Sequence, residues 1–180
     1  MKTIKKNIPV IAGASALLLS SFAFSGTLGT TSSDDVIINL DIPALVQISD
    51  MADIDLGVFA GVDITSTPEL GCVYSNGGTY SLTITSTNTF NLISPTTSDS
   101  IAYTVNMGTE NAGGTPAPAT PVTHGSAITS LTADTASTTC ATNGDNLAID
   151  VTVTAAAAGA PSVSPATDYT DTLTLLVAAE

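Results

Sequence analysis

Few residues in this sequence have side chains suited to catalysis, and His124 is the only histidine. A serine or cysteine nucleophile needs a histidine base, which an acidic residue in turn orients. His124 lies in a segment rich in Gly and Pro, where we expect it to be solvated. No glycine-rich phosphate-binding motif is present. Paired carboxylates for sugar cleavage stay open because Asp is plentiful, but Trp is absent. The sequence therefore indicates a protein that is not an enzyme and that uses no cofactor.

Three acidic residues lie close together at Asp50, Asp53 and Asp55, as in a cation site. They lack the central Gly and the terminal Glu of a calcium-binding EF-hand loop. We interpret them as a solvated acidic turn, and calcium binding is the alternative.

Cys72 and Cys140 are the only two cysteines. In an exported chain two cysteines most simply form one disulfide. A metal site is the alternative, but the close Cys and His spacing that zinc needs is missing. The sequence therefore predicts a disulfide between Cys72 and Cys140.

The first 25 residues have the pattern of a secretory signal peptide. Lys2, Lys5 and Lys6 precede the apolar residues 8–24, and small residues allow a cut after Ser25. An uncleaved membrane anchor is the alternative, although the apolar stretch is short for a membrane span. We expect an exported protein with residues 1–25 removed.

Removal of residues 1–25 would leave a chain without any Lys or Arg. The formal charge of −13 would become −16, because all 16 acidic residues lie beyond the three signal lysines. Binding to nucleic acid or to an anionic membrane needs cations on the protein, so both are disfavoured. The charge fits high solubility, a salty setting or a partner with a basic face.

Residues 36–42 show a period of two. Val36, Ile38, Leu40 and Ile42 alternate with a polar row that only Ile37 interrupts. This pattern predicts an extended strand with one apolar face. Residues 26–35 before it are small and polar, and Pro43 after it ends the regular run. We therefore predict an N-terminal extension, residues 26–43, that carries a strand.

The rest of the chain, residues 44–180, reads as strands and turns. Apolar alternation or apolar runs predict strands at residues 44–48, 54–59, 79–86, 89–93, 101–107, 127–131, 147–153 and 169–177, and residues 72–74 lead into a predicted turn at 75–78. Residues 108–125 and 155–165 are predicted loops. This spacing favours one all-β domain, an antiparallel sandwich of immunoglobulin-like shape.

The last predicted strand has no following chain that could cover its outer edge. Tyr169, Leu173, Leu175 and Val177 lie on one face of it, and Asp171 interrupts that face near its start. A strand edge without a partner tends to pair with another chain.

Several segments resemble the spore coat U-like pilin subunits of the archaic chaperone–usher pathway. The resemblance covers roughly residues 54–177, and the ending Tyr-x-Asp-Thr-Leu-Thr-Leu is its most specific part, while Thr167 replaces a Gly usual in the family. The segments that carry it are residues 72–74, 78–82, 90–92 and 101–105, Cys140 and residues 169–175.

This resemblance implies an incomplete sandwich that lacks its final strand. A periplasmic chaperone would lend a strand, and an outer-membrane usher would exchange it for the extension of the next subunit, giving an extracellular pilus used in adhesion and biofilm formation. The donor residues would be Val36, Ile38, Leu40 and Ile42, and the acceptor groove would be lined by Tyr169, Leu173, Leu175 and Val177. Such pairing is strand addition between copies.

Two other interpretations stay open from the sequence. One is a self-contained secreted sandwich that binds sugar or calcium through residues 108–125 or 50–55. The other is a tip adhesin, but two-domain tips are longer and lack a donor extension.

We predict that trypsin will not cut the exported protein, even when it is unfolded, because no Lys or Arg follows Lys6. Mass spectrometry of a digest in denaturant checks this. Tryptic fragments would show that the signal cut has been placed wrongly.

Overall fold

A computed structural model describes residues 28–110 and 115–180. The predicted signal peptide and its cut lie outside these residues, as do Gly113 and Gly114 of the predicted loop. By its contacts the chain divides into two units, Met1–Asp41 and Ile42–Glu180. No helix among the described residues is long and apolar enough to cross a membrane.

The described part of the first unit, residues 28–41, contains no helix or strand and is exposed throughout. Val36, Ile38 and Leu40 expose 85%, 89% and 80% of their surface. The predicted strand is therefore not formed within a single chain, because a lone β-strand has no partner for its backbone groups.

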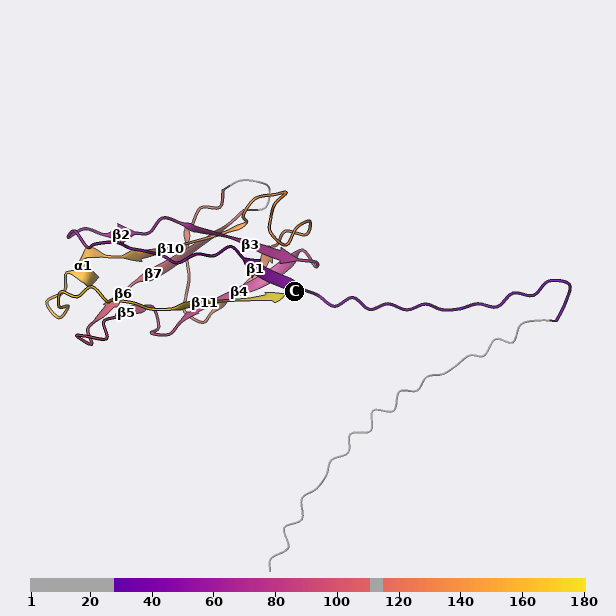
Figure 1. Ribbon diagram of the computed structural model, residues 1–180, viewed down its shortest axis with the longest axis horizontal. Helices are drawn as coiled ribbons and strands as arrows, with labels where there is room; N and C mark the ends of the chain where they lie inside the picture. Colours follow the sequence, from indigo (N-terminus) through magenta and orange to yellow (C-terminus); the bar gives the residue numbers. More distant parts are fainter. Residues whose placement is uncertain (1–27, 111–114) are drawn as a thin grey trace, which may run out of the picture. The chain divides into compact units, whose positions relative to one another are not determined.

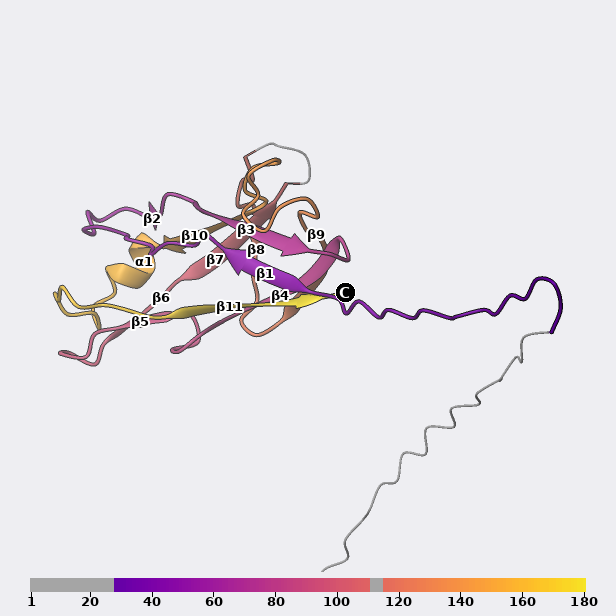
Figure 2. The same cartoon turned by 45° about the vertical axis from the view of Figure 1, so that its right-hand side comes forward.

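The second unit is an all-β sandwich of antiparallel sheets, as the sequence predicted (Figures 1 and 2). The larger sheet has the order β1 (Val46–Ser49), β3 (Glu69–Ser75), β10 (Leu147–Val153), β7 (Thr104–Thr109) and β8 (Thr120–Pro121), and β2 (Ile64–Thr65) pairs with the end of β10. The smaller sheet has the order β11 (Leu173–Ala179), β4 (Thr79–Ser86) and β9 (Ala127–Thr132). The second unit also contains a separate two-stranded ribbon, β5 (Asn91–Ile93) with β6 (Ser100–Ala102), and the short helix α1 (Ala155–Ala158).

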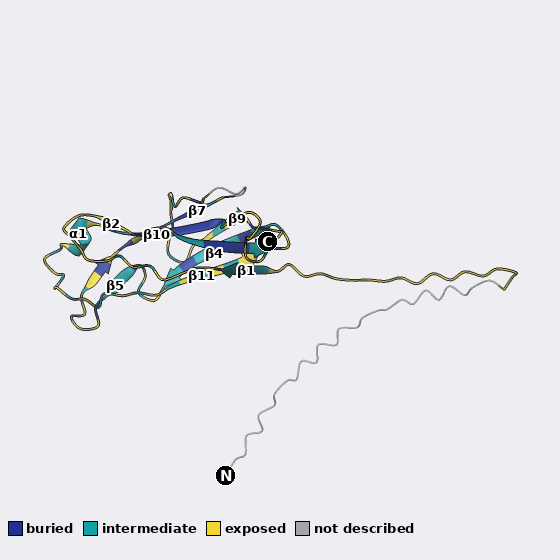
Figure 3. Ribbon diagram, turned by 45° about the horizontal axis from the view of Figure 1, so that its top comes forward, coloured by how far each residue is buried: buried dark blue, intermediate teal, exposed yellow. Residues whose placement is uncertain are grey.

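The core lies between the two sheets, and Figure 3 shows the buried stretches of β4, β7 and β10. Residues 147–149 of β10 are fully buried at consecutive positions. In β4, by contrast, Tyr80, Leu82 and Ile84 are fully buried at every second position. This alternation follows from the pleat of a strand, which turns successive side chains to opposite faces. Burial of these large side chains is the main contribution to stability.

The cysteines form the predicted disulfide. Cys72 on β3 is bonded to Cys140, with their Cα atoms 5.6 Å apart and 68 positions apart in the sequence. Closing a loop of this length stabilises the fold by roughly 4 kcal/mol on the chain-entropy estimate.

Two predicted strands need correction. Residues 54–59 form no strand, because the Asp55 carboxylate accepts a hydrogen bond from the Gly57 backbone N–H and Gly57 has a φ of 69°, which turns the chain. Residues 101–107 form two strands, β6 and β7, which separate at Tyr103 as the chain leaves the ribbon for the larger sheet.

The two predicted loops also contain regular structure. Within residues 108–125, β8 pairs with β7, and Val122 is buried and bonded to the backbone of Val105. Within residues 155–165, the Thr154 hydroxyl caps helix α1 by accepting a hydrogen bond from the Ala157 backbone N–H.

Burial of Tyr80 leads to a prediction about alkaline pH. Its hydroxyl is buried without a hydrogen-bond partner, and burial raises the pKa of Tyr80 to about 12. Tyrosine in an unfolded chain ionises near pH 10, so the stability that depends on this neutral phenol is intact below about pH 10 and is lost as the pH rises toward 12.

We predict that Tyr80→Phe raises the free energy of unfolding at neutral pH by about 1 kcal/mol, because a buried hydroxyl without a partner is unfavourable. The variant should also lose less stability between pH 10 and pH 12. Urea titrations at several pH values measure both effects, and a large loss of stability at neutral pH would contradict the prediction.

Candidate functional site

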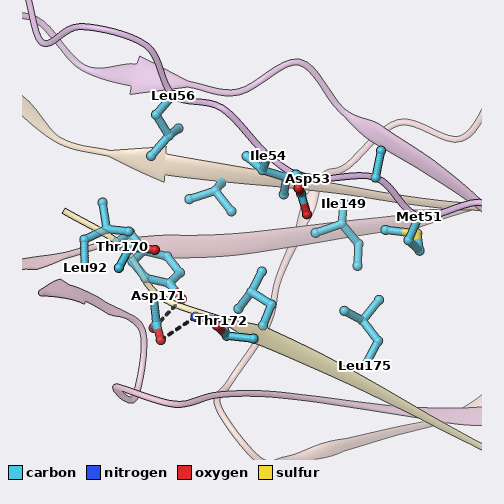
Figure 4. A pocket seen from close by; sticks show the side chains of 14 residues that line it. Met51, Asp53, Ile54, Leu56, Leu92, Ile149, Thr170, Asp171, Thr172 and Leu175 are labelled. Carbon is cyan, nitrogen blue, oxygen red and sulfur yellow. Dashed lines mark hydrogen bonds between the residues drawn. The ribbon is translucent and has the colours of Figure 1, made fainter. Parts of the chain in front are cut away.

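A groove of about 510 Å³ lies along one edge of the sandwich (Figure 4). One side is formed by the chain after β1, the other by β11 and the residues before it, and side chains of the core lie between them. The lining residues are Met51, Ala52, Asp53, Ile54, Leu56, Leu92, Tyr103, Ile149, Val151, Thr170, Asp171, Thr172, Leu173 and Leu175.

The groove follows a strand edge that lacks a partner. β11 pairs with β4 along its whole length, from Leu173 opposite Ser86 to Ala179 opposite Tyr80. Among the described residues no strand pairs with the other edge of β11, and the same holds for the outer edge of β1 in the larger sheet. The groove therefore offers unpaired backbone groups beside apolar side chains.

Two of the four predicted acceptor residues line this groove. Leu173 and Leu175 alternate with the exposed Thr174 and Leu176 along β11. Val177 packs against the core further along β11. Tyr169 precedes the strand, and its hydroxyl donates a hydrogen bond to the carbonyl oxygen of Ser164 at 2.8 Å.

The opposite side of the groove was not identified from the sequence. Ile54 and Leu56 lie on it and pack against the core from a segment without strand pairing. Their alternation was visible in the sequence, but it could not show which strand they face. Ile149 and Val151 of β10 form part of the base, and alternation alone did not separate them from the closed core.

One end of the groove is polar, and its polar groups are paired. Asp171 accepts hydrogen bonds from the Tyr103 hydroxyl at 2.8 Å and from the backbone N–H groups of Thr172 and Asn88 at 2.8 and 3.1 Å. Burial alone raises the pKa of Asp171, but the hydrogen bonds from Tyr103, Ser86 and these N–H groups outweigh it and hold the pKa below its usual range. The Asp171 carboxylate thus has a structural role, because it joins three separate parts of the chain by hydrogen bonds.

His124 is not solvated as the sequence suggested. It is half-buried, and its ring packs edge-on against Phe90 at 5.0 Å between centroids. Its Nε2 accepts a hydrogen bond from the Ser86 backbone N–H at 3.0 Å. The Ser86 hydroxyl instead accepts from the Phe90 backbone N–H. The imidazole therefore contacts the main chain of Ser86 and not its hydroxyl. Ser86 and His124 thus do not form the serine–histidine pair that nucleophilic catalysis needs.

Of the three residues of the predicted acidic turn, only Asp53 lines the groove. Asp50 accepts a hydrogen bond from the Ser49 hydroxyl, Asp55 accepts from the Gly57 N–H, and Asp53 lines the groove. Within residues 28–110 and 115–180, no three His, Cys, Asp or Glu side chains are grouped so that they could hold a metal ion.

No protein-family model matches the chain, and the curated proteins contain no significant match.

The Tyr103–Asp171 hydrogen bond leads to a prediction opposite to that for Tyr80. Tyr103→Phe should lower the free energy of unfolding at neutral pH by about 1 kcal/mol, because Asp171 loses a donor. The pKa of Asp171 is lowered in the folded state, so its contribution is present above its unfolded value of about 3.9 and is lost as the pH falls.

The variant should therefore lose less stability than the wild type on acidification. Urea titrations at neutral pH and near pH 3 measure the difference. Equal stability of the two proteins at both pH values would show that this hydrogen bond contributes nothing.

Proposed function

We propose that this chain is a structural pilus subunit that polymerises by donor-strand exchange. Residues 36–42 of one copy would fill the groove of a second copy and pair with the free edge of β11. The observation that carries the proposal is that one chain has both an apolar groove on an unpaired strand edge and an exposed aliphatic segment with a period of two.

The donor segment and the groove suit each other in length and polarity. The side formed by residues 170–175 extends roughly 20 Å, and residues 36–42 extend slightly more, at about 3.3 Å per residue. Val36, Ile38, Leu40 and Ile42 would replace water against Leu173, Leu175 and Ile54. Burial of four aliphatic side chains at roughly 2 kcal/mol each gives about 8 kcal/mol before the entropy of ordering is subtracted.

The other edges of the sandwich carry features that discourage pairing. β8 contains Pro121, which has no N–H to offer to another strand. β9 has a bulge opposite β4, with Ser130 at a φ of 58° and its N–H bonded to the Glu180 carboxylate. A proline and a bulge are common protections of edge strands. The edge of β11 lacks both, which supports strand addition there.

The charge of the chain limits how copies could associate. No Lys or Arg follows Lys6, so two exported copies could form no Lys or Arg salt bridge with each other. A contact made of backbone hydrogen bonds and apolar side chains does not need one. A head-to-tail contact of this kind builds an open filament.

The partners follow from the resemblance to spore coat U-like pilins. On this proposal a periplasmic chaperone covers the groove first, an outer-membrane usher exchanges it for the next subunit, and the fibre lies outside the cell, where it serves adhesion and biofilm formation. The domains are then a signal peptide at 1–25, a donor extension at 26–43 and a pilin domain at 44–180.

The proposal is tested by giving the protein a second donor strand. Residues 26–180 are extended after Glu180 by a flexible linker and a copy of residues 34–42. We expect a monomer whose melting temperature is about 10 °C higher, because a net gain of a few kcal/mol shifts the melting of a domain of this size by that amount.

Matched variants of the added copy separate insertion from mere attachment. Ile38→Asp places a charge on the face that enters the groove and should abolish the gain, whereas Ile37→Asp lies on the opposite face and should keep it. Calorimetry and size-exclusion chromatography provide both readouts. If the unchanged strand leaves melting and oligomerisation as they were, the sandwich does not accept this strand.

A further inference from the structure

The side chain of Asn76, in the turn after β3, forms hydrogen bonds with residues 43–45 near the start of the second unit. Its Oδ1 accepts a hydrogen bond from the Leu45 N–H at 2.7 Å, and its Nδ2 donates one to the Pro43 carbonyl at 2.9 Å. The Asn76 backbone N–H donates to the Leu45 carbonyl at 3.2 Å. The backbone from Pro43 to Leu45 is thus bonded to a single residue.

This arrangement lengthens the pairing between β1 and β3 beyond the strands themselves. The ladder ends where Val46 lies opposite Ser75, because the chain then turns into β4. Asn76 supplies a donor and an acceptor from its amide in place of the main chain that has turned away. Pro43 has no N–H, so the anchored segment ends there without an unsatisfied donor, and Ile42 before it is 71% exposed.

The anchored segment matters because the extension has a groove within its own chain. β1 pairs antiparallel with β3, β3 and β4 are joined by a tight turn, and β4 pairs antiparallel with β11. β1 and β11 therefore run in opposite directions. As a hairpin with residues 43–45 as its loop, residues 36–42 could pair with the outer edge of β1, which has no strand partner among the described residues. Three-residue hairpin loops are common.

We infer that Asn76 is a positioning residue that prevents this hairpin and so keeps the donor strand available to a second copy of the chain. Back-folding would have to reverse the chain within residues 43–45, where Leu45 and Pro43 are bonded to Asn76. Insertion into a second copy leaves all of these bonds in place. The inference rests on the proposed function. It specifies that the donor strand enters the groove of a second copy and does not pair with its own chain.

The experiment compares residues 26–180 as the wild type and as Asn76→Ala, both refolded from denaturant at one concentration. Size-exclusion chromatography with light scattering gives the ratio of compact monomer to polymer. Elastase, which cuts after small aliphatic residues, reports whether the extension of the monomer is protected. Loss of two hydrogen bonds of ordinary strength should raise the ratio of protected monomer to polymer about tenfold.

Two further variants make the comparison specific. Asn143→Ala removes another exposed turn asparagine, whose amide donates to Asp134, and should leave the ratio unchanged. Asn76→Asp keeps an acceptor for Leu45 but loses the donor to Pro43, so we expect a smaller rise, and this variant decides the question if Asn76→Ala does not fold. Hydrogen exchange at the Leu45 amide should be faster in Asn76→Ala.

The possible outcomes separate this inference from the proposed function. An unchanged ratio in Asn76→Ala, with faster exchange at Leu45, would overturn the role of Asn76 and leave strand exchange intact. Wild-type monomers with a protected extension would also overturn it, since the strand would then fold back despite Asn76. Wild-type monomers with a cleavable extension would overturn the proposed function, and the inference with it.

Discussion

The free edge of β11 is the constraint on which the rest of the arrangement depends. A strand edge leaves N–H and C=O groups that need partners, and the side chains beside this one, Leu173 and Leu175, are apolar. Water satisfies the backbone groups but not the aliphatic surface, whereas a strand with alternating aliphatic residues satisfies both. Residues 36–42 have that alternation, and they lie exposed in the single chain.

The described residues include no Lys or Arg, and this shapes which groups pair with the many carboxylates. Asp168 accepts hydrogen bonds from the hydroxyls of Ser94 and Thr96. The hydroxyl and backbone N–H of Ser164 hold the pKa of Asp99 below its usual range, as the hydroxyls do for Asp168. Hydroxyls and N–H groups thus replace the Lys and Arg partners found in most proteins. Folding then depends on backbone ladders, apolar burial and one disulfide, none of which weakens in strong salt as ion pairs do.

Strict alternation made part of the fold predictable from the sequence. Residues 79–86 and 147–153 form strands with the predicted bounds, because a regular period of two admits little else. Residues 54–59 did not follow their pattern, since the side chain of Asp55 and the conformation of Gly57 turn the chain there. The groove was predictable only on its β11 side. Its other side and its base depend on which strands lie opposite one another, and a period of two carries no information about that.

A strand that can pair within its own chain has an advantage over one from a second chain. An intramolecular partner linked by a short segment acts at an effective concentration in the millimolar range, well above the concentration of free subunits in a dilute solution. Exchange between copies therefore requires that back-folding be disfavoured. The donor strand and the domain that accepts it have the same sequence whether pairing occurs within one chain or between two copies. The feature that disfavours back-folding therefore has to lie in the segment that joins the strand to its own domain. Three hydrogen bonds join the backbone of Pro43 and Leu45 to Asn76, two through its side-chain amide and one through its backbone N–H, and they act where a three-residue hairpin loop would form. They would favour the filament over the monomer without changing either the strand or the groove.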